Sequence, residues 1–390
     1  MEKILAILGI IIIIGGSYLL SNNKKDINWK SIGFVFITQV ILAFLLIKTS
    51  VWRIVEWISN GVIWIIGRAS EGINFVFGGL VPDGGNVFFI NSLLPIVFIS
   101  ALMGILFHFG VLQKFIGVVG NAIAKLLKVD TLVAVNLITN MFLGQSESLF
   151  VTKSYLSKAS NSVIFATLVG GMASISVSVI GLYASFGASV EWIVVSMSLM
   201  AFSSFILTQI IMPSPYTGED IEVENDKGIN VIDTMMNYAT SGFKGVIGIS
   251  IALMVFLSIV YLINGLIGFV APALALEKIL GVIFFPVALL MGVPMNEVSE
   301  VAQILATKLI TNEAVAYALP SFVMLSTKVK AMVTVSLCGF AGIGSIGILL
   351  GGYSAVAPNK VGVVARLGMK ALVTATFVNI LTGCLIGLFL

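Results

Sequence analysis

The sequence predicts an all-α polytopic membrane protein with about eight transmembrane helices, interfacial helices and two re-entrant helical hairpins in inverted repeats. Three observations support this fold class. Of the 390 residues, 58% are hydrophobic and only 10% are charged, whereas about a quarter of the residues in a soluble domain are charged. Several apolar runs approach the length that crosses a bilayer. Two polar interruptions occur in the same order in each half of the chain.

The composition also limits the function. A soluble enzyme or a nucleic-acid-binding protein needs a charged surface, and a net charge of +3 spread along the chain provides no basic patch. The two cysteines, Cys338 and Cys384, lie in apolar runs without a metal-binding spacing. The single histidine, His108, excludes a histidine-based metal centre, and we expect it to be structural.

Long apolar runs mark simple spans, since a transmembrane helix needs about 20 mostly apolar residues. Four runs approach this length: Ile4–Leu20, Ile32–Ile47, Phe88–Phe107 and Val246–Leu262. The first run begins like a signal peptide, but no A-x-A site follows it and Lys24 and Lys25 come directly after it. We therefore expect an uncleaved span followed by a cytoplasmic loop.

Other stretches are expected at the membrane surface. Residues 51–81 mix three tryptophans with charged residues, which is typical of a helix in the interface plane, and residues 82–85 predict a turn. Residues 213–228 form an acidic linker to which we assign no chemistry. Residues 229–245 are predicted to form a second surface helix.

Residues 132–156 are too polar for a simple span. Apolar flanks enclose a polar centre at residues 144–148, and lysines lie at both ends. Each flank is too short to cross the bilayer, so the segment is predicted to be a re-entrant hairpin. Such backbone is tolerated only where it is buried in protein or lines a cavity. A span whose centre contains glycine and serine residues, and which we expect to be interrupted there, follows at residues 162–183. Another span follows at residues 192–212.

The second half repeats this design. Residues 275–319 hold apolar arms around a polar middle, with a tip at residues 311–313. A span with a glycine-rich centre, which we expect to be interrupted there, follows at residues 331–351. A last span follows at residues 367–390. Interrupted helices at corresponding places in two halves are the best sequence indication of a transporter's binding site.

The repeat is also visible as an offset in the sequence. A shift of 168 residues places Gly171 on Gly339, and the alanine and isoleucine that follow also match in order. The same shift places Gln145 on Glu313. In both halves a polar hairpin tip is followed by a span with a glycine-containing centre. This shared order supports the repeat more strongly than these identities do.

Two carboxylates, Glu147 and Glu313, lie at the hairpin tips. A charged side chain at the bilayer centre costs roughly 2.5–3.5 kcal/mol on insertion scales, so each needs compensation. Each could bind a polar solute, carry a proton or hold its tip in shape, and their occurrence at both tips favours function. Lys308 could reach the interface or neutralise Glu300 or Glu313, and the sequence does not decide between these.

Neutral oxygens near the broken helices suit a monovalent cation. The C-terminal ends of broken helices expose carbonyl groups, and Asn140 and Ser174 lie beside them. A set of neutral donors favours Na⁺ over a divalent ion, although Asn140 could equally be a plain helix cap. Phe340, beside the second broken span, could pack against lipid or contact a planar ring.

Three motifs resemble those of the concentrative nucleoside transporter family. The first, similar to the family's first hairpin tip, is Gly144-Gln145-Ser146-Glu147. The second, similar to its signature, is Ala306-x-Lys308-x-x-x-Asn312-Glu313-Ala314-Val315-Ala316-Tyr317, with Ala314 where the family usually has phenylalanine. The third, similar to its seventh-span motif, is Cys338-Gly339-Phe340-Ala341 followed by Ser345. The three motifs occur in the family's order.

The resemblance implies a sodium-driven symporter that imports nucleosides such as uridine or adenosine, with proton coupling or a related polar solute as alternatives. It implies a multi-pass protein of the plasma (inner) membrane that assembles as a homotrimer. A transport domain would move against a scaffold in an elevator-type cycle. We expect no enzymatic activity and no nucleic-acid partner; a passive channel and an intramembrane hydrolase are the remaining alternatives.

The resemblance also implies the site residues. The expected substrate-binding residues are Gln145, Ser146, Glu147, Val179, Asn312, Glu313, Phe340 and Ser345. The residues of the first tip would bind the nucleobase, and Glu313 would bind the ribose hydroxyls. The expected sodium ligands are the side chains of Asn140 and Ser174 and the carbonyls of Leu143 and Ile175.

One position departs from the family pattern. Many members have asparagine two residues after the matched Phe340, where it contacts the ribose, and here the residue is Gly342. A glycine cannot supply that hydrogen bond, which is worth about 1 kcal/mol net. Either water replaces it or the solute preference differs.

The chain is expected to divide into scaffold and transport parts. Residues 1–120 form scaffold, with two spans, the interfacial helix and a third span. Residues 121–212 form the first transport-domain repeat. Residues 213–274 hold the acidic loop, the surface helix and a scaffold span, and residues 275–390 form the second transport-domain repeat.

Overall fold

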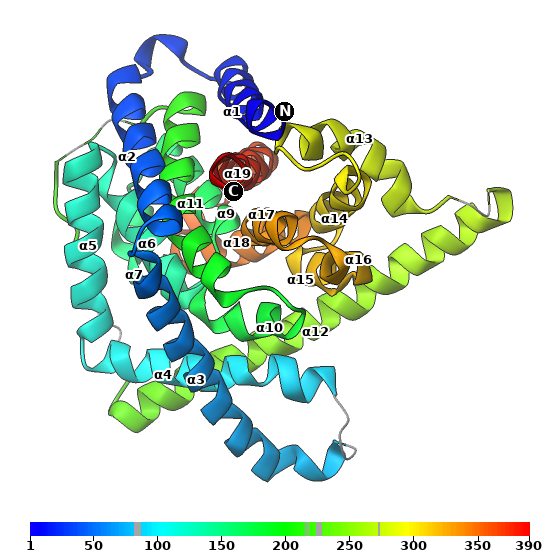
Figure 1. Cartoon of the computed structure of the whole chain (residues 1–390). Helices are drawn as coiled ribbons and strands as arrows, with labels where there is room; N and C mark the ends of the chain where they lie inside the picture. Colours follow the sequence, from blue (N-terminus) through cyan, green and yellow to red (C-terminus); the bar gives the residue numbers. More distant parts are fainter. Residues whose placement is uncertain (82–86, 215, 217, 224–227, 272–273) are drawn as a thin grey trace.

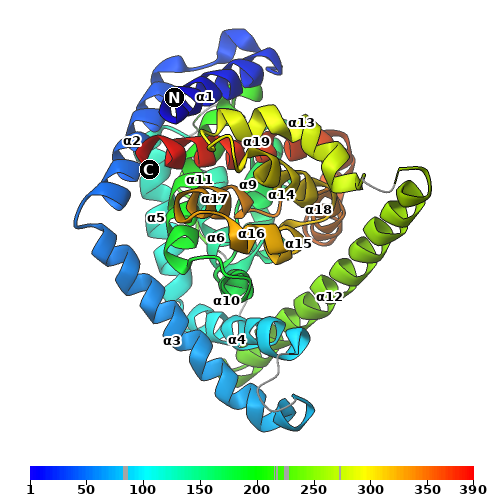
Figure 2. The same cartoon turned by 45° about the vertical axis from the view of Figure 1, so that its right-hand side comes forward.

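The computed structural model describes residues 1–81, 87–214, 216, 218–223, 228–271 and 274–390, and this part of the chain contains helices and no strands. The turn predicted at residues 82–85 and part of the acidic linker lie outside the described residues. Figure 1 shows the C-terminal helix α19 (Val361–Phe389) end-on near the centre of the molecule. Helices from both halves of the chain pack around it, and both chain ends lie on the same side (Figures 1 and 2).

Three helices begin the chain. α1 (Glu2–Leu19) and α2 (Trp29–Lys48) match the first two predicted spans within a few residues. α1 packs against α19, and α2 packs against α11 (Val190–Ile211), which matches the predicted span at residues 192–212. α3 (Trp52–Phe77) is the predicted amphipathic helix, and its tryptophans Trp57 and Trp64 are mostly exposed.

The third predicted span is a helix pair. It begins with the short π-helical turn η3 (Phe89–Leu93) and continues as α4 (Pro95–His108). α4 packs along α12 (Val231–Val270), and His108 Nδ1 lies 2.9 Å from Thr234 Oγ1. His108 thus joins the two helices.

α12 corrects one expectation. The prediction of a separate surface helix at residues 229–245 is wrong, because these residues are mostly the first part of one continuous helix of 40 residues. Asn230 caps its start by accepting a hydrogen bond from Asp233 N (2.9 Å), and no proline interrupts it. At 1.5 Å per residue the helix is about 60 Å long, roughly twice the hydrocarbon thickness of a bilayer. Figure 2 shows it running obliquely beside the rest of the molecule.

The first repeat contains the predicted hairpin and broken span. α5 (Val111–Leu127) precedes the hairpin, and Asp130 caps the first arm by accepting from the amides of Leu132 and Val133. The hairpin consists of α6 (Thr131–Leu143), α7 (Glu147–Val151) and α8 (Lys153–Leu156). The broken span consists of α9 (Asn161–Ala173), the 3₁₀ turn η4 (Val177–Val179) and α10 (Ile180–Ser185).

The second repeat has the same order. α13 (Leu276–Leu290) packs against the first arm of the hairpin, and the 3₁₀ turn η5 (Pro358–Lys360) leads into α19. The hairpin consists of α14 (Val298–Ile310), α15 (Glu313–Ala318) and α16 (Pro320–Met324). The broken span consists of α17 (Thr327–Leu337) and α18 (Ile343–Val356).

The number of spans agrees with the expected fold. Among the described residues, seven segments are long and apolar enough to cross a membrane. The eighth expected span is the pair α17 and α18, neither of which is long enough by itself. The two breaks therefore occur at corresponding places, inside segments that would otherwise span.

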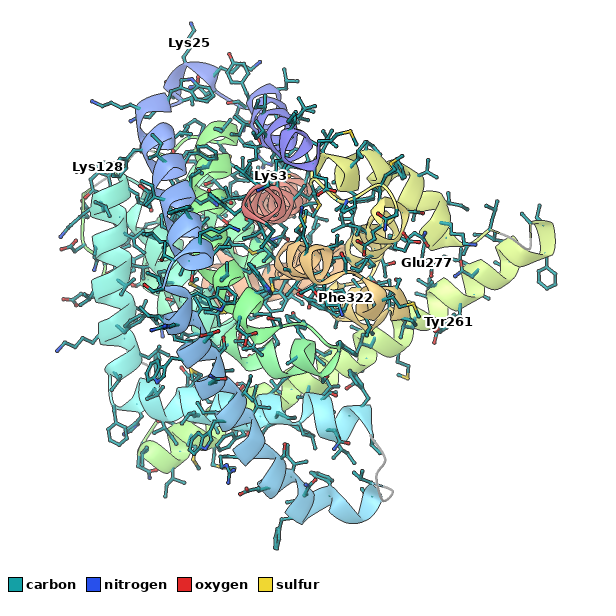
Figure 3. All side chains as sticks on the ribbon, viewed as in Figure 1. Lys3, Lys25, Lys128, Tyr261, Glu277 and Phe322 are labelled. Carbon is teal, nitrogen blue, oxygen red and sulfur yellow. The ribbon has the colours of Figure 1, made fainter. Side chains whose placement is uncertain are left out.

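The surface of the molecule is apolar where lipid would lie. Tyr261 projects from α12 and is 70% exposed, whereas Phe322 of the second hairpin is completely buried (Figure 3). Many other apolar side chains of α12, such as Met254 and Leu262, are also exposed. Apolar surface of this extent indicates contact with a membrane.

The broken helices α9 and α17 end against each other. Gly339 follows α17, and a Cβ atom there would lie 2.4 Å from the carbonyl oxygen of Ala173 and 2.7 Å from Asn379 Nδ2. No side chain fits at that separation, so glycine is required for the two helix ends to meet.

We predict that Gly339→Ala lowers the melting temperature of the purified protein in detergent. The added methyl group must push the two helix ends apart, and overpacking of this kind costs about 1–3 kcal/mol. Gly351→Ala in α18 is the matched control, because nothing lies within 4 Å of its added Cβ. Equal melting temperatures for the two variants would contradict the close approach.

Candidate functional site

The two hairpin tips and the two helix breaks line one cavity of about 520 Å³. A wall of this cavity is formed by α12, near Gly245 and Gly248. All eight residues that the sequence predicted as substrate-binding contribute to the lining: Gln145, Ser146, Glu147, Val179, Asn312, Glu313, Phe340 and Ser345. The fold therefore brings together residues that are up to 200 positions apart in the chain.

Local geometry explains the shape of the first tip. Gly144 has a φ of +103°, a value that favours glycine, and this turns the chain from α6 into α7. A Cβ atom on Gly144 would lie 3.1 Å from Glu147 Oε2, so the carboxylate folds over the glycine. Gln145 is nearly buried, and its Oε1 has no hydrogen-bond partner. An unpaired buried acceptor is costly, and a donor group of a bound solute would satisfy it.

The second tip is built around a buried carboxyl group. Asn312 caps α15 by accepting a hydrogen bond from Val315 N (3.0 Å), which fixes the start of the helix at Glu313. Tyr183 donates a hydrogen bond to Glu313 Oε1 (3.0 Å), and the Tyr183 ring stacks on Tyr317 at 4.7 Å. Tyr183 thus orients Glu313 from the first repeat. No feature of the sequence predicts this contact between residues 130 positions apart.

The second break contributes an aromatic ring and a hydroxyl group. Phe340 lines the cavity, and Ser345 Oγ donates a hydrogen bond to the Phe340 carbonyl. A Cβ atom on Gly342 would lie 3.1 Å from the carbonyl oxygen of Thr311. The departure from the family pattern at this position therefore coincides with close packing of the break against the second tip.

Two of the predicted cation ligands, the side chains of Asn140 and Ser174, contact each other close to the first tip. The Asn140 amide donates to Ser174 Oγ (2.5 Å) and to the carbonyls of Gly170 (3.3 Å) and Gly171 (3.4 Å). Both Asn140 and Ser174 are completely buried or nearly so. Leu143 ends α6 and Ile175 lies just after α9, so both predicted carbonyl ligands belong to helix ends.

One atom of this cluster fits a cation in particular. Asn140 Oδ1 is buried and has no hydrogen-bond partner, and a monovalent cation would supply the missing positive charge. The donors are neutral oxygens, which suit Na⁺ better than a divalent ion. Among the described residues, no group of three or more His, Cys, Asp or Glu side chains is arranged to hold a metal.

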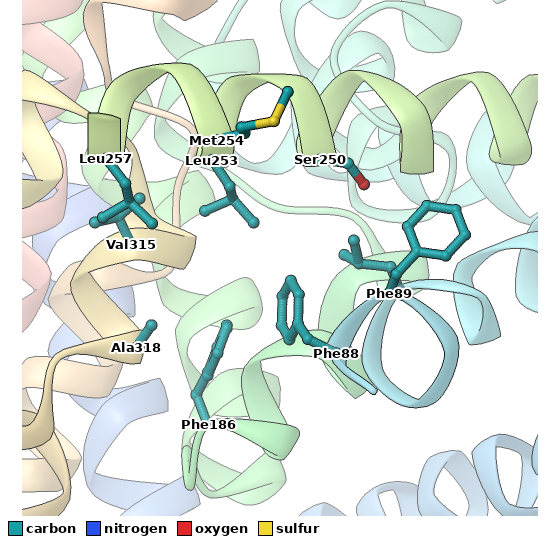
Figure 4. A pocket seen from close by; sticks show the side chains of 10 residues that line it. Phe88, Phe89, Phe186, Ser250, Leu253, Met254, Leu257, Val315 and Ala318 are labelled. Carbon is teal, nitrogen blue, oxygen red and sulfur yellow. The ribbon is translucent and has the colours of Figure 1, made fainter. Parts of the chain in front are cut away.

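A second cavity, of about 390 Å³, lies between α12 and the second hairpin (Figure 4). Its lining includes the rings of Phe88, Phe89 and Phe186. Ser250 supplies the hydroxyl group visible on its α12 side (Figure 4). A polar solute needs several convergent polar groups, so the cavity at the hairpin tips is the candidate site.

Two lysines take positions that the sequence did not settle. Lys244 of α12 lines the cavity, which sequence reasoning missed because it assigned this stretch to a surface helix. Lys308 is buried, and its ammonium donates to Ser336 O (2.8 Å) and Asn379 Oδ1 (2.7 Å). It therefore does not reach the interface, and it interacts electrostatically with the buried Glu313 carboxyl group without a hydrogen bond between them.

Three family models match the chain. They are the Na⁺ dependent nucleoside transporter N-terminus at residues 8–80, nucleoside recognition at residues 89–190, and the Na⁺ dependent nucleoside transporter C-terminus at residues 192–387. The last of these covers half of the chain by itself, and together they cover the hairpins, the breaks and α12.

Several curated proteins are similar over the whole chain. The nucleoside permease NupC of Helicobacter pylori is 30% identical, and the match covers 100% of this chain and 98% of that protein. An uncharacterized transporter of Haemophilus influenzae is 32% identical with the same coverage. Human sodium/nucleoside cotransporter 1 is 26% identical, over 99% of this chain and 64% of that protein.

Solved structures agree with the fold. CNTnw in an inward-facing substrate-bound state matches with a TM-score of 0.92 and 33% identity, over 100% of this chain and 98% of that chain. A variant of CNTnw in an outward-facing state matches with a TM-score of 0.93 and 32% identity, over 100% and 99%. Because the scores are nearly equal, they support the fold and not one conformation.

Proposed function

The chain belongs to the family of Na⁺-dependent, concentrative nucleoside transporters, and we propose that it is a symporter that imports nucleosides such as uridine or adenosine against their gradient. The observation that carries this proposal is the single cavity onto which both hairpin tips and both helix breaks converge. Its volume of about 520 Å³ lies in the range of small-molecule sites.

The cavity offers complementary groups for the two halves of a nucleoside. Gln145, Ser146 and Glu147 of the first tip present donors and acceptors to the edge of a nucleobase, and Phe340 offers a ring face or edge. Val179 adds apolar wall. Glu313, positioned by Asn312 and held by Tyr183, accepts hydrogen bonds from the ribose hydroxyl groups, with Ser345 close by.

The position of the cation cluster supports the proposed coupling to sodium. Asn140 lies one helical turn before Gly144, and Ser174 lies at the break that faces the first tip. An ion held by Asn140, Ser174 and the carbonyls of Leu143 and Ile175 would fix the tip that carries Gln145. Ion and nucleoside would then stabilise the same conformation, which is the thermodynamic basis of coupling. In the alternative, Glu147 or Glu313 carries a proton.

The movement that we propose is of the elevator type. Residues 1–120 and 213–274 would form the scaffold, in a homotrimer within the plasma (inner) membrane. Within these residues, α3, α4 and α12 pack on one another or run along one side of the bundle, which supports this division. Hairpins and breaks would move as the transport domain. Gly245 and Gly248 of α12 have no neighbour within 4 Å of an added Cβ, so the wall that the transport domain faces is smooth.

We predict that the protein in proteoliposomes concentrates labelled uridine or adenosine when a sodium gradient is imposed. Uptake is measured with a sodium gradient, with a proton gradient and with neither. Accumulation driven by protons alone would keep the transporter and discard the sodium site. Equilibration without any gradient dependence would indicate a channel, and no uptake of either nucleoside would overturn the substrate assignment.

We predict that Asn140→Ala and Ser174→Ala raise the sodium concentration needed for half-maximal uptake, by about tenfold if each loses one charge-assisted contact of roughly 1.5 kcal/mol. The matched control is Ser198→Ala, because Ser198 Oγ donates to the carbonyl four residues earlier, as Ser174 Oγ does, but away from the cluster. A sodium dependence that is unchanged in the first two variants would remove them from the ion site.

We predict that Glu313→Ala abolishes uridine binding while the variant keeps its oligomeric state, since the ribose hydroxyl groups lose their acceptor. Binding is measured by isothermal titration in saturating sodium. Glu300→Ala is the control, because Glu300 lies exposed on the neighbouring α14. Normal uridine affinity in the Glu313 variant would show that this carboxyl group does not contact the solute.

A further inference from the structure

Another cavity lies between α13 and α14, away from the nucleoside site. It has a volume of about 360 Å³, and its lining consists of Lys278, Gly281, Val282, Phe285, Ser299 and Gln303. None of these residues lines the cavity at the hairpin tips. α13 lies at the edge of the molecule in both views (Figures 1 and 2), so a ligand reaches this cavity from the surroundings and not through the transport path.

Packing around α13 holds the walls of this cavity in place. A Cβ atom on Gly281 would lie 2.9 Å from Gln303 Cγ, so α13 and α14 touch at this glycine and the cavity lies beside the contact. Asn264 of α12 fixes the start of α13, because its side chain accepts a hydrogen bond from Leu276 N (2.7 Å) and donates to the Glu277 carboxylate (3.0 Å). The cavity is therefore formed by helices and not by a loop.

The two walls of the cavity differ in chemistry. Val282 and Phe285 make the α13 wall apolar. On the α14 wall the Gln303 amide donates to Ser299 Oγ (3.3 Å), so an amide and a hydroxyl group lie together. Lys278 lies one helical turn before Val282 on the same face of α13 and adds an ammonium group. A ligand that matches this lining has an anionic, hydrogen-bonding part and an apolar part.

The side chains around the cavity indicate the level of the lipid headgroups. On α13, Ile279, Val282 and Ile283 are between 42% and 73% exposed. The charged side chains of Lys278 on α13 and Glu300 on α14 are exposed beside them. Apolar and charged side chains that are exposed along the same short stretch are typical of a helix in the interface plane.

The charges favour an anionic ligand over a zwitterionic one. Among the described residues that line the cavity, Lys278 is the one with a charge. The neighbouring carboxylates do not oppose an anion there, because Glu277 is hydrogen-bonded to Asn264 and Glu300 does not line the cavity. Lys278 makes another interaction within the protein, but an ammonium group has three donors and shares them with a ligand. Basic side chains at a membrane surface attract anionic lipids.

We propose that this cavity binds one phospholipid with an anionic headgroup. The phosphate group lies at Lys278 and Gln303, and the first part of an acyl chain lies along Val282 and Phe285. The bound lipid joins α13 to the first arm of the second hairpin. No nucleoside takes part, so this lipid site does not depend on the proposed function.

The first test compares three probes on detergent-purified protein stripped of lipid: phosphatidylglycerol, phosphatidylcholine and inorganic phosphate. Native mass spectrometry measures the binding of each lipid, and the melting temperature reports its effect. We expect phosphatidylglycerol to bind about fivefold more tightly than phosphatidylcholine, which is the effect of one basic residue at an anionic surface. Phosphate alone should leave the melting temperature unchanged, because it has no chain. Equal binding of the two lipids would overturn the proposal, and so would an equal stabilisation by phosphate alone, which would indicate a free-anion site.

The second test assigns the headgroup to this cavity. Lys278→Gln should lower the affinity for phosphatidylglycerol about fivefold and leave that for phosphatidylcholine unchanged, whereas Lys278→Arg should keep the wild-type affinities. The matched control is Lys330→Gln, because Lys330 is also partly exposed and donates to the carbonyl of Val323 (2.7 Å) but does not line the cavity. A Lys278→Gln protein that binds phosphatidylglycerol as the wild type does would refute the site.

The third test locates the acyl chain with a phosphatidylglycerol that carries a photoreactive diazirine in its chain. After irradiation and digestion, mass spectrometry should find adducts on the peptide that contains Val282 and Phe285. Val282→Trp, which fills the cavity, should remove these adducts. Ile283→Trp is the matched control and should keep them, because Ile283 is also exposed but does not line the cavity. Adducts that persist in the Val282 variant, or a cross-link between the α13 helices of two copies of the chain, would overturn the proposal.

Discussion

The structure depends on satisfying the ends of helices that stop inside the membrane. In hydrocarbon an unpaired backbone group costs several kcal/mol. The last carbonyl groups before each break have no amide partner within their own helix. Asn379 of α19 donates to the ends of both, at Ala173 and next to Leu337. Because these ends are compensated, the breaks can stay open and offer polar groups to a cavity in the middle of an apolar protein.

The same constraint divides the molecule into two kinds of helix. α12 is continuous over 40 residues and hydrogen-bonds its own backbone along its length, so it can face lipid on one side and the cavity on the other. The hairpins and broken spans need protein around them, and they are largely buried around α19. Most polar groups of the cavity therefore come from the buried, interrupted part, and the continuous helix α12 provides a wall that adds Lys244.

The sequence predicted the hairpins and the breaks, because each is a local departure from an apolar run, and the family resemblance implied eight of the residues that line the cavity. Its error at residues 229–245 came from interpreting a more polar stretch as a separate helix, although the helix continues without a break to Val270. The contacts that hold the site could not be predicted. Tyr183 reaches Glu313 across 130 positions and Lys308 reaches Asn379 across 71, and only the packing of the two repeats brings these pairs together.

Gly342 connects the selectivity of the site to its packing. A side chain at this position would begin 3.1 Å from the carbonyl oxygen of Thr311, so it could be admitted only if the second tip moved. The glycine therefore lets the tip approach the break, and the same approach leaves no amide to contact a ribose. In the site that we propose, recognition of the sugar then depends on Glu313, whose position is fixed by the same tip through Asn312 and by Tyr183 from the other repeat.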